Sequence, residues 1–549
     1  MSNTLVRRLG ALVAASALTA TGITLVAAPA NAVAVPRPVT QGANWLAGQL
    51  TNGLLHSPNY SASGYDDYGL SIDAAFALDA VGGHADDVKA IGKAIRDNYY
   101  NYITPSLDFG DNALYGGAVA KALVLAQVAG TGPSSYLATL RSDLEKQVAD
   151  AAPIAGRVQN SDETVYLPPN FEPTPGDSAN VISQGLTARA LTAAGSTEAA
   201  AAVDFLLDQQ CAAGFFREQF NVDKASPDQS CNSASPAATA SIDATSQAVI
   251  NLSALPATPA ITDALAAART WLKAQQASDG SFNGDNSNST GLAASAVGAS
   301  PEATKAAAFL RDHQADDTDA CTALRDDVGA IAFTSAALGS GRTAGIPTIR
   351  DDTSQVQDQW RRATTQALPA LEFLAVPEAD ALALSGPARF VLAGSTASYR
   401  VSGSSSANRL CVSTPGASKI GTASGSGAAT VALKLPVGPA TRTVTVTDRD
   451  GNTDSVLTKV LAAKTLTVKP TTNKVTRGKT VKVTVSGLAA GEHVTLRYQG
   501  VVILSNATAT STGTYVKTVA VGTKLGSASF AALGEFGVRK GVATITVVK

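Results

Sequence analysis

The stretch WLKAQQASDGSF, residues 271–282, joins an aromatic residue and a leucine to a glutamine pair, and then places a glycine just before a second aromatic residue. Three other stretches repeat the phrase loosely: WLAGQLTNG from residue 45, FLLDQQCAAGFF from residue 205 and FLRDHQADD from residue 309. In three of the four copies an aromatic residue lies four positions before a glutamine, so both lie on one side of a helix that the following glycine ends. Self-similarity of this kind predicts a repeat architecture built from helices.

Short segments almost without charge lie between the copies. Small residues cover most of their helical circumference, which predicts that other helices surround them. The helices that alternate with them are amphipathic and charged. Six inner and about seven outer helices over residues 38–375 favour a closed double ring over an open solenoid, because no terminal repeat resembles an exposed cap. The inner segments are expected to begin near residues 71, 115, 180, 241, 288 and 327.

The repeated phrase is followed by a small-residue helix that begins D-A-T at residue 243 or N-S-T-G-L-A at residue 288. This combination resembles the repeat of the terpenoid cyclase and protein prenyltransferase α/α-toroid superfamily, also called squalene-oxidase-type repeats. The resemblance covers residues 38 to about 375 and implies an (α/α)6 toroid. It does not by itself imply an activity, because this toroid also carries complement thioester domains and cobalamin carriers.

The catalytic motifs that the resemblance would imply are absent or incomplete. Class II cyclases protonate an alkene with the central acid of a D-x-D-D motif, and the nearest stretch here, residues 241–244, keeps only Asp243. A magnesium-binding D-D-x-x-D cluster begins at Asp66 and Asp67, but Leu70 stands where its third acid should be. The zinc ligand set of the prenyltransferases and the thioester motif G-C-G-E-Q are also missing. We therefore expect no cofactor and no metal, and the sequence favours a non-catalytic protein.

Polar and aromatic residues nevertheless gather where the inner helices begin. The stretch YDDYGLSID from residue 65 precedes the first inner helix, and Asp243 occupies the matching start of the fourth. In a toroid these starts point toward one end of the central funnel, where a ligand would bind. The competing explanation is structural, because an aspartate in a first helical turn complements the helix dipole without any ligand.

A second aromatic-rich stretch, residues 98–117, reads as a long connection that either overhangs the funnel as a sugar- or isoprenoid-facing lip or packs its aromatic rings together. With the helix starts, it supplies the ligand-binding candidates, which are Tyr65, Asp66, Asp67, Tyr68, Asp73, Tyr115 and Asp243.

The first residues predict export. Arg7 and Arg8, a mostly apolar run and the A-x-A site at residues 30–32 indicate a signal peptide over residues 1–32. A membrane anchor is the alternative, but the run is only weakly hydrophobic. No later segment approaches the roughly 20 apolar residues that span a bilayer. We expect a secreted or extracellular protein without a membrane span in the mature chain.

Export makes the four cysteines candidates for disulfides, for which three connectivities are possible. The order along the chain favours pairing Cys211 with Cys231 and Cys321 with Cys411, and the second bridge would then tie the end of one domain to the start of the next. The alternative is a free Cys411. Zinc is disfavoured because no C-x-x-C occurs and the histidines are scattered.

From residue 380 the hydrophobic pattern alternates with a period of two, which indicates β-strands. We expect one β-sandwich domain over residues 378–463 and a second over 464–549, both following a toroid domain over 33–377. The second resembles the Ig-like modules of bacterial surface and secreted proteins. It holds twelve Lys and Arg residues against two acids, a net charge of +10, whereas the whole chain carries −2.

Such a basic module predicts attachment to an anionic cell-wall polymer by an attraction that salt weakens. The alternative is that its lysines protect strand edges from aggregation. Nucleic acid is disfavoured as a partner, because stacking aromatic residues are sparse.

The sequence as a whole predicts a multidomain α + β protein, an (α/α)6 toroid followed by two β-sandwich domains. It favours a secreted, non-catalytic binding or cell-surface-associated protein whose partner is a cell-wall polymer or a small hydrophobic or glycan ligand. The alternative is an enzyme in the toroid funnel, either an isoprenoid cyclase or transferase relative or a carbohydrate-active hydrolase or lyase.

Overall fold

The computed structural model describes most of the chain and combines helices with β-sheets. The signal peptide predicted for residues 1–32 lies outside the described residues. Contacts divide the chain into two units: Met1–Asp316 with Ala323–Pro377, and Asp317–Thr322 with Glu378–Lys549. The described ranges are 35–57, 64–104, 114–161, 164–167, 172–175, 177–231, 239–347, 356–375 and 381–549.

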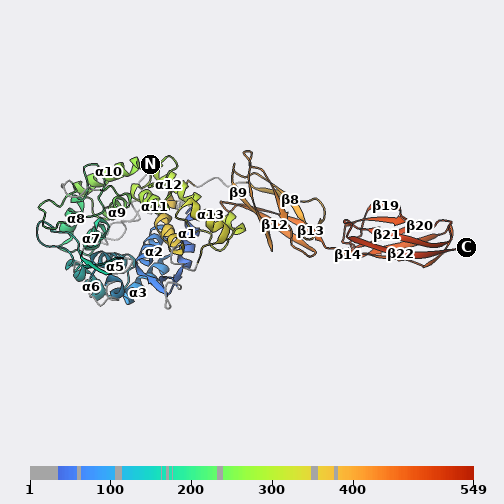
Figure 1. Ribbon diagram of the computed structural model, residues 1–549, viewed down its shortest axis with the longest axis horizontal. Coiled ribbons are helices and arrows are strands. Elements are labelled where there is room, and N and C mark those ends of the chain that lie inside the picture. Colours follow the sequence, from blue (N-terminus) through green and yellow to red (C-terminus); the bar gives the residue numbers. More distant parts are fainter. Residues whose placement is uncertain are drawn as a thin grey trace, which may run out of the picture. The chain divides into compact units, whose positions relative to one another are not determined.

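In the described part of the first unit, six helices contact one another in a closed cycle (Figure 1). Each touches the next, and the last touches the first. Five of these inner helices, all except α14, are poor in charged residues, as the sequence predicted, because helices on both flanks and an outer layer cover them. In order, they are α2 (Tyr68–Val81), α5 (Gly116–Ala129), α7 (Val181–Ala193), α9 (Ile242–Leu252), α11 (Ser287–Val297) and α14 (Val356–Ala367).

An outer layer of amphipathic helices packs against this cycle, and Figure 1 shows α6, α8 and α10 on the outside of α5, α7 and α9. In α3 (Ala85–Asp97), for example, Val88, Ile91 and Ile95 are buried, whereas the charged residues face away. The other outer helices are α1 (Arg37–Gly48), α6 (Ser134–Glu145), α8 (Ala199–Asp208), α10 (Pro259–Ala274) and α12 (Pro301–Asp312).

The prediction of an inner helix from residue 327 was wrong. Residues 327–334 form a loop, and the helix α13 (Ser335–Ala344) starts after it. Gly329 has a φ of +106°, and a side chain there would collide with the backbone of Gln41, so a glycine loop rather than a helix crosses this point. The sixth inner helix is α14, whose polar sequence VQDQWRRATTQA hid its position.

The quoted stretch turns out to join neighbouring repeats. Gln276 Nε2, at the end of α10, donates to the carbonyl oxygen of Gly280 at 2.9 Å and to that of Glu302 on α12 at 2.8 Å. Gly280 has a φ of +95°, and an added Cβ would lie 2.5 Å from the carbonyl oxygen of Lys305. Phe282 N donates to Thr290 Oγ1 on α11 at 2.9 Å. The phrase thus fixes an outer helix to the next outer helix and to an inner one.

Two other copies of the phrase also use a glutamine side chain to bind two backbone carbonyl oxygens. Gln210 Nε2 donates to the carbonyl oxygens of Gly214 and Ala264, both at 2.9 Å. Gln314 Nε2 donates to the carbonyl oxygens of Gly329 at 3.0 Å and Pro38 at 2.9 Å. Since Pro38 belongs to α1, the last copy closes the ring onto the first outer helix. Backbone N–H groups two residues beyond the glycines bond to inner-helix side chains in the pairs Leu55–Ser71, Phe216–Thr245 and Ile331–Thr364.

The remaining elements of the first unit are short. They are β1 (Leu50–Thr51), β2 (Leu54–Ser57), β3 (Tyr65–Asp67), α4 (Tyr99–Ile103), β4 (Thr164–Leu167), β5 (Glu172–Pro175) and η3 (Leu368–Phe373). The strands β1, β2 and β3 form one small antiparallel sheet, and it brings the first candidate stretch to the start of α2.

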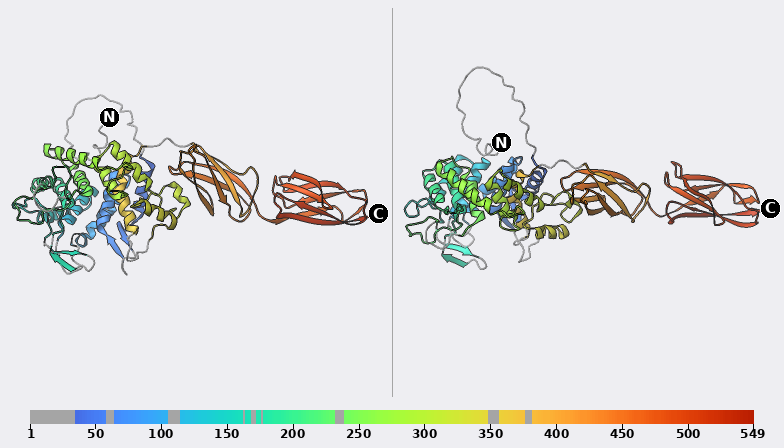
Figure 2. Two further views of the ribbon diagram at one scale, coloured as in Figure 1. Left: turned by 45° about the horizontal axis from the view of Figure 1, so that its top comes forward. Right: turned by 90° about the horizontal axis from the view of Figure 1, so that it is seen from above.

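The strands of the second unit form two groups, each with its own hydrophobic core (Figures 1 and 2). In the first group a five-stranded sheet, β10-β9-β12-β13-β7, and a three-stranded sheet, β11-β8-β6, share one core. The strands are β6 (Ala383–Ser385), β7 (Val391–Leu392), β8 (Thr396–Ser402), β9 (Arg409–Thr414), β10 (Ala417–Thr422), β11 (Ala429–Lys434), β12 (Ala440–Asp448) and β13 (Thr453–Leu461).

The second group is built in the same way. One sheet has the order β14-β22-β21-β18-β19 with β16 also paired to β22, and the other has the order β15-β17-β20. Alternating buried and exposed residues along β17 fit a sheet with one face on the core. The strands are β14 (Lys464–Thr465), β15 (Thr467–Pro470), β16 (Lys474–Thr476), β17 (Thr480–Ser486), β18 (His493–Tyr498), β19 (Val501–Thr508), β20 (Thr514–Ala520), β21 (Gly526–Leu533) and β22 (Arg539–Val548).

Both predicted disulfides are present, Cys211–Cys231 and Cys321–Cys411. The second bridge was expected to join two domains, but both of its cysteines lie in the second unit. Cys321 lies in the short helix η2 (Asp317–Cys321), and the segment Asp317–Thr322 belongs to the same unit as Cys411. Two disulfides are consistent with an extracellular protein. Among the described residues, no helix combines the length and the apolar character needed to cross a bilayer.

Candidate functional site

Asp243 is the candidate whose chemistry departs most from that of an ordinary surface acid. It lies in the first turn of α9, where Ser241 caps the helix by accepting from Ala244 N at 3.1 Å. Burial raises the pKa of Asp243 above its ordinary value of 3.8, a hydrogen bond with Ser289 opposes the rise, and the charge of Glu218 adds to it. Asp243 Oδ1 is buried and has no hydrogen-bond partner among the described residues.

Ser289 lies on α11, so Asp243 sits where two neighbouring inner helices begin. One turn further along α9, the fully buried hydroxyl of Ser246 also lacks a partner among the described residues. Buried oxygens without partners cost about 1–3 kcal/mol each unless water or a ligand supplies a donor. The start of α9 is therefore suited to a ligand that donates hydrogen bonds.

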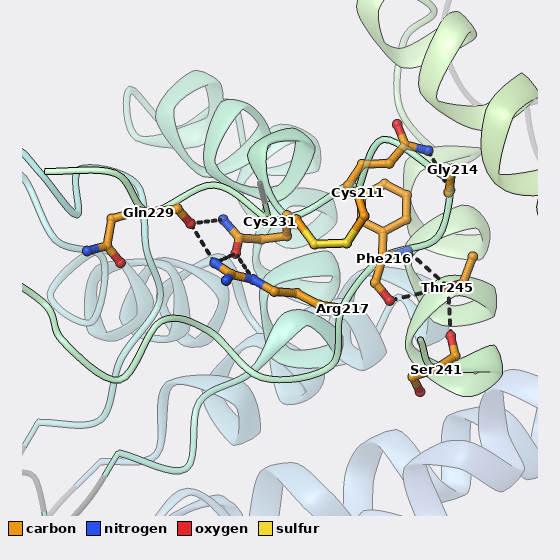
Figure 3. The surroundings of a disulfide bond; sticks show 10 residues. Cys211, Gly214, Phe216, Arg217, Gln229, Cys231, Ser241 and Thr245 are labelled. Atoms are coloured by element: carbon orange, nitrogen blue, oxygen red, sulfur yellow. Dashed lines mark hydrogen bonds between the residues drawn. A yellow bond between two sulfur atoms is a disulfide. The ribbon is translucent and has the colours of Figure 1, made fainter. Parts of the chain in front are cut away.

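The Cys211–Cys231 bridge shapes the loop beside this site (Figure 3). Within the loop, buried Arg217 donates to Gln209 Oε1 from Nε at 2.9 Å and from Nη2 at 2.6 Å. The next residue, Glu218, accepts a hydrogen bond from the Ser241 hydroxyl at 3.2 Å. The bridge and the arginine thus hold a second acid near Asp243, which contributes to the raised pKa.

The acids of the first candidate stretch are engaged in structural contacts. Asp67 caps α2 by accepting from Leu70 N at 2.8 Å. Asp73 forms an ion pair of 2.6 Å with Lys121 of α5, and Lys121 Nζ also donates to the carbonyl oxygen of Gly69 at 2.9 Å. These contacts fix the start of α2 against α5, which is the structural role that the sequence left open.

Tyr102 is a member of this cluster that sequence reasoning did not select. Its pKa is raised by burial and further by the charges of Asp73 and Asp67 and the hydroxyl of Tyr65. Its ring lies 6.5 Å from that of Tyr68. The signal that pointed toward it was the aromatic-rich stretch 98–117, within which only Tyr115 was chosen.

The other candidates lie at the edge of this cluster. Asp66 Oδ1 lies 2.6 Å from His56 Nδ1 across the β2–β3 hairpin, and Tyr65 on the same strand is 45% exposed. Tyr115 precedes α5, and its backbone N–H donates to the carbonyl oxygen of Ile103 at 2.9 Å. In the cycle of inner helices, α5 and α7 on one side and α11 and α14 on the other lie between α2 and α9, the helices that carry the first stretch and Asp243.

A histidine-centred contact was also missed. His313 Nδ1 lies 2.8 Å from the carbonyl oxygen of Phe309, while its Nε2 lies 2.6 Å from Asp285 Oδ1 and 3.0 Å from Ser335 Oγ. In a serine nucleophile site the acid and the serine contact opposite ring nitrogens. Because both share Nε2 here, the trio acts as a clasp at the start of α13.

Partial burial raises the pKa of Asp285, but hydrogen bonds from His313 and from Ser335 outweigh it, so the net pKa is below its ordinary value of 3.8. Among the described residues, no group of three or more His, Cys, Asp and Glu side chains is placed to hold a metal ion.

A surface hollow of about 780 Å³ lies away from all these residues. It is bordered by the end of α6, the loop 148–154, the turn at Thr197 and Glu198, and Lys224. None of the predicted ligand-binding residues lines it, and Lys224 already contacts Asp177 Oδ2 at 3.1 Å. The hollow therefore gives no independent support to the predicted site.

In the folded structure, most basic side chains of residues 464–549 have no acidic partner among the described residues. Glu492 is fully buried and forms a two-point ion pair with Arg539, at 2.6 Å from Nε and 2.7 Å from Nη2. Glu535 pairs with Arg389, with both contacts at 2.6 Å. Both acids of the module are thus neutralised. Eleven of its twelve Lys and Arg residues, all except Arg539, form no ion pair with the described residues.

No protein-family model and no curated protein matches this chain. Among solved structures, it is similar to a protein from Actinoplanes at 18% identity, over 61% of this chain and 98% of that one, with a TM-score of 0.39. It is similar to the type II terpene cyclase MstE from Scytonema at 14% identity, over 61% and 96% of the two chains, with a TM-score of 0.40. The adhesin InvE from Yersinia pseudotuberculosis matches at 16% identity, over 31% and 59%, with a TM-score of 0.17. All three scores are below 0.5 and carry no argument about fold or activity.

Proposed function

We propose that this chain is a secreted, non-catalytic binding protein held at an anionic surface, such as a cell-wall polymer, by its basic module. In this proposal residues 33–377 form an α/α toroid, and residues 378–463 and 464–549 form β-sandwich domains, the second Ig-like. The supporting observation is that eleven cationic side chains of residues 464–549 have no acidic partner among the described residues, while both acids of the module are already paired.

A high local charge of one sign attracts a polymer of the other sign without requiring a shaped pocket. Such an attraction fades as salt shortens the screening length from about 10 Å at 0.1 M to about 3 Å at 1 M. The acids in the first candidate stretch support the non-catalytic part, because Asp67 caps a helix and Asp73 is neutralised by Lys121.

The test uses the full chain and isolated bacterial cell walls, with and without chemical removal of their anionic polymers. After mixing and centrifugation, we expect the protein to pellet with intact walls at low salt and to stay in the supernatant at 1 M salt or with stripped walls. Failure to pellet with intact walls at low salt would show that the proposed attachment is wrong.

The alternative is an enzyme or ligand-binding site in the helical unit, and one observation favours it. Asp243 combines a raised pKa with a buried oxygen that has no partner among the described residues. The buried carboxylate oxygen can accept a hydrogen bond from a hydroxyl group of a small glycan or an isoprenoid alcohol.

Native mass spectrometry of the protein from its own culture supernatant tests this alternative. An added stoichiometric mass that disappears in Asp243→Asn, but persists in the matched variant Asp73→Asn, supports a ligand at the start of α9. A bare mass in the parent protein counts against it.

A further inference from the structure

Four exposed basic residues of the second β-module, Lys474, Arg477, Lys479 and Lys524, lie at one end of it and are here called the basic end; Lys549, also exposed, follows Val548 at the same end. Lys474 pairs in register with Thr546, near the end of β22, and Arg477 N donates to the carbonyl oxygen of Val548 at 3.0 Å.

The segments just before β17 and just after β20, two strands that pair with each other, bring in the other two members. Val521 N donates to the carbonyl oxygen of Lys479 at 2.9 Å, and Lys524 comes three residues later, just before the pairing of Gly526 with Val547. Since neighbouring strands lie about 4.8 Å apart, these ladder positions place the four residues on a few adjoining strand ends.

The acids lie at the opposite end of the same strand. Glu492 binds Arg539, which begins β22, and Glu535 comes just before that strand. β22 has ten residues and rises about 3.3 Å per residue, so roughly 30 Å separate its two ends. That separation is about three screening lengths at 0.1 M salt. The acids therefore do not offset the charge of the basic end.

We propose that the basic end is the attachment point and that it binds a linear phosphodiester polymer without bases; this inference rests on the proposed function. A phosphodiester carries one permanent charge per unit, which suits four closely placed cations, and Arg477 can contact two phosphate oxygens at once. The segments that carry the basic end, residues 471–480 and 521–526, contain no aromatic residue on which a base could stack. Tyr498 contacts one of them through its hydroxyl, which accepts from Gly522 N at 3.3 Å, while its ring packs 5.1 Å from that of Phe530.

The test compares two variants of the full chain with equal charge. In one, Lys474, Arg477, Lys479 and Lys524 become Gln. In the control, the exposed residues Lys464, Lys469, Lys482 and Lys540 of the strands β14, β15, β17 and β22 become Gln; of these, Lys482 follows Lys479 by three residues. Both variants lower the module from +10 to +6. Because all eight side chains are exposed, equal thermal unfolding of the three proteins is expected and is checked first.

Binding is measured by titration with synthetic poly(glycerol phosphate). Each basic residue near an anionic surface contributes about 1 kcal/mol, so the basic-end variant should bind about 100- to 1000-fold more weakly, and the control less than about 10-fold. The slope of log affinity against log salt should also fall by about 3 in the basic-end variant and by less than 1 in the control.

The contradicting results are distinct. Equal losses in the two variants would show that the attachment is spread over the module. Equal binding to poly-glutamate of the same charge would reject the phosphodiester, and tighter binding to double-stranded DNA would assign the end to nucleic acid. If the parent protein pellets with cell walls but does not bind poly(glycerol phosphate), this inference is wrong and the proposed function stands. If the parent protein does not pellet with cell walls, the proposed function itself is wrong.

Discussion

Gln314 Nε2 lies 2.9 Å from the carbonyl oxygen of Pro38, although 276 residues separate them in the chain. The same amide group also holds the carbonyl oxygen of Gly329 at 3.0 Å. In the copies that begin at residues 205 and 271 the equivalent glutamine joins neighbouring repeats, and here it joins the last repeat to the first. It acts with the contact between α14 and α2 and with the bond from Trp45 Nε1 to Asp327 Oδ1 at 3.0 Å, which also connect the end of the helical unit to its start.

Replacing Gln314 by Ala should release the first outer helix. Two backbone carbonyls lose their donor, which costs about 2 to 5 kcal/mol of unfolding free energy. Hydrogen exchange should accelerate in residues 37–48, which have no other glutamine clamp of this kind in the described structure. Gln276→Ala is the matched control, because it should lose similar stability but release α12 instead. Unchanged exchange in α1 would contradict the role in closure.

Gly280→Ala should destabilise the helical unit by about 3 kcal/mol or more. The positive φ of +95° costs about 1–2 kcal/mol for any side chain, and the new Cβ would press on the Lys305 carbonyl oxygen at 2.5 Å. Gly284 in the same loop has a φ of +72° and open space around it, so Gly284→Ala isolates the cost of the backbone angle. Chemical denaturation of the two variants measures the difference, and equal losses would argue against close packing at Gly280.

Compared with the parent protein, the Asp243→Asn variant should gain stability as the pH rises. Since the folded pKa of Asp243 lies above 3.8, the folded state holds the proton more tightly, and the parent protein loses stability as pH rises from about 4 through that folded pKa. Asn does not titrate, so the stability difference between variant and parent should shift in favour of the variant over this window. Denaturation curves between pH 4 and 8 test the sign, and a constant difference would contradict the raised pKa.

Asp285→Asn should show the opposite sign. The folded pKa of Asp285 lies below 3.8, so its ionised form stabilises the clasp with His313 above that value, and the contribution is lost as pH falls through the folded pKa. The variant should therefore be less stable than the parent at pH 6, with the gap closing in acid. Because Asp285 is 48% exposed, the gap should be small. Denaturation of this variant at pH 6 and in acid supplies the comparison, and a gap that widens in acid would contradict the clasp.

The helical repeat could be predicted because its glutamine, glycine and small-residue patterns are local. The partners of Gln276 and Gly280 could not, because which backbone lies beside them depends on the neighbouring repeat. α14 escaped prediction because much of its buried surface is polar: Arg361, Thr364 and Thr365 are buried together with Trp360 and Ala363, so the helix lacks the apolar small-residue pattern of the other inner helices.

The candidate ligand site stays a prediction. The sequence singles out the start of α9 through the position of Asp243, but Ser289, its partner, lies 46 residues later and carries no signal of its own. For Asp73, the structural contact is an ion pair with Lys121 on another helix, a partner that sequence distance concealed. The count of charged residues in the sequence identified the basic module. Only the strand pairing shows that its two acids lie near the start of β22, away from the basic end.

The closure by Gln314 also sets an order of events during biosynthesis. α1 is among the first helices to be made, but the side chain that holds its first turn comes 276 residues later. A chain growing from its N-terminus must therefore keep α1 without this partner until nearly the whole helical unit exists. The contact between α1 and the last copy of the phrase can form only after residue 314 has been made, although α1 can pack against α2 much earlier.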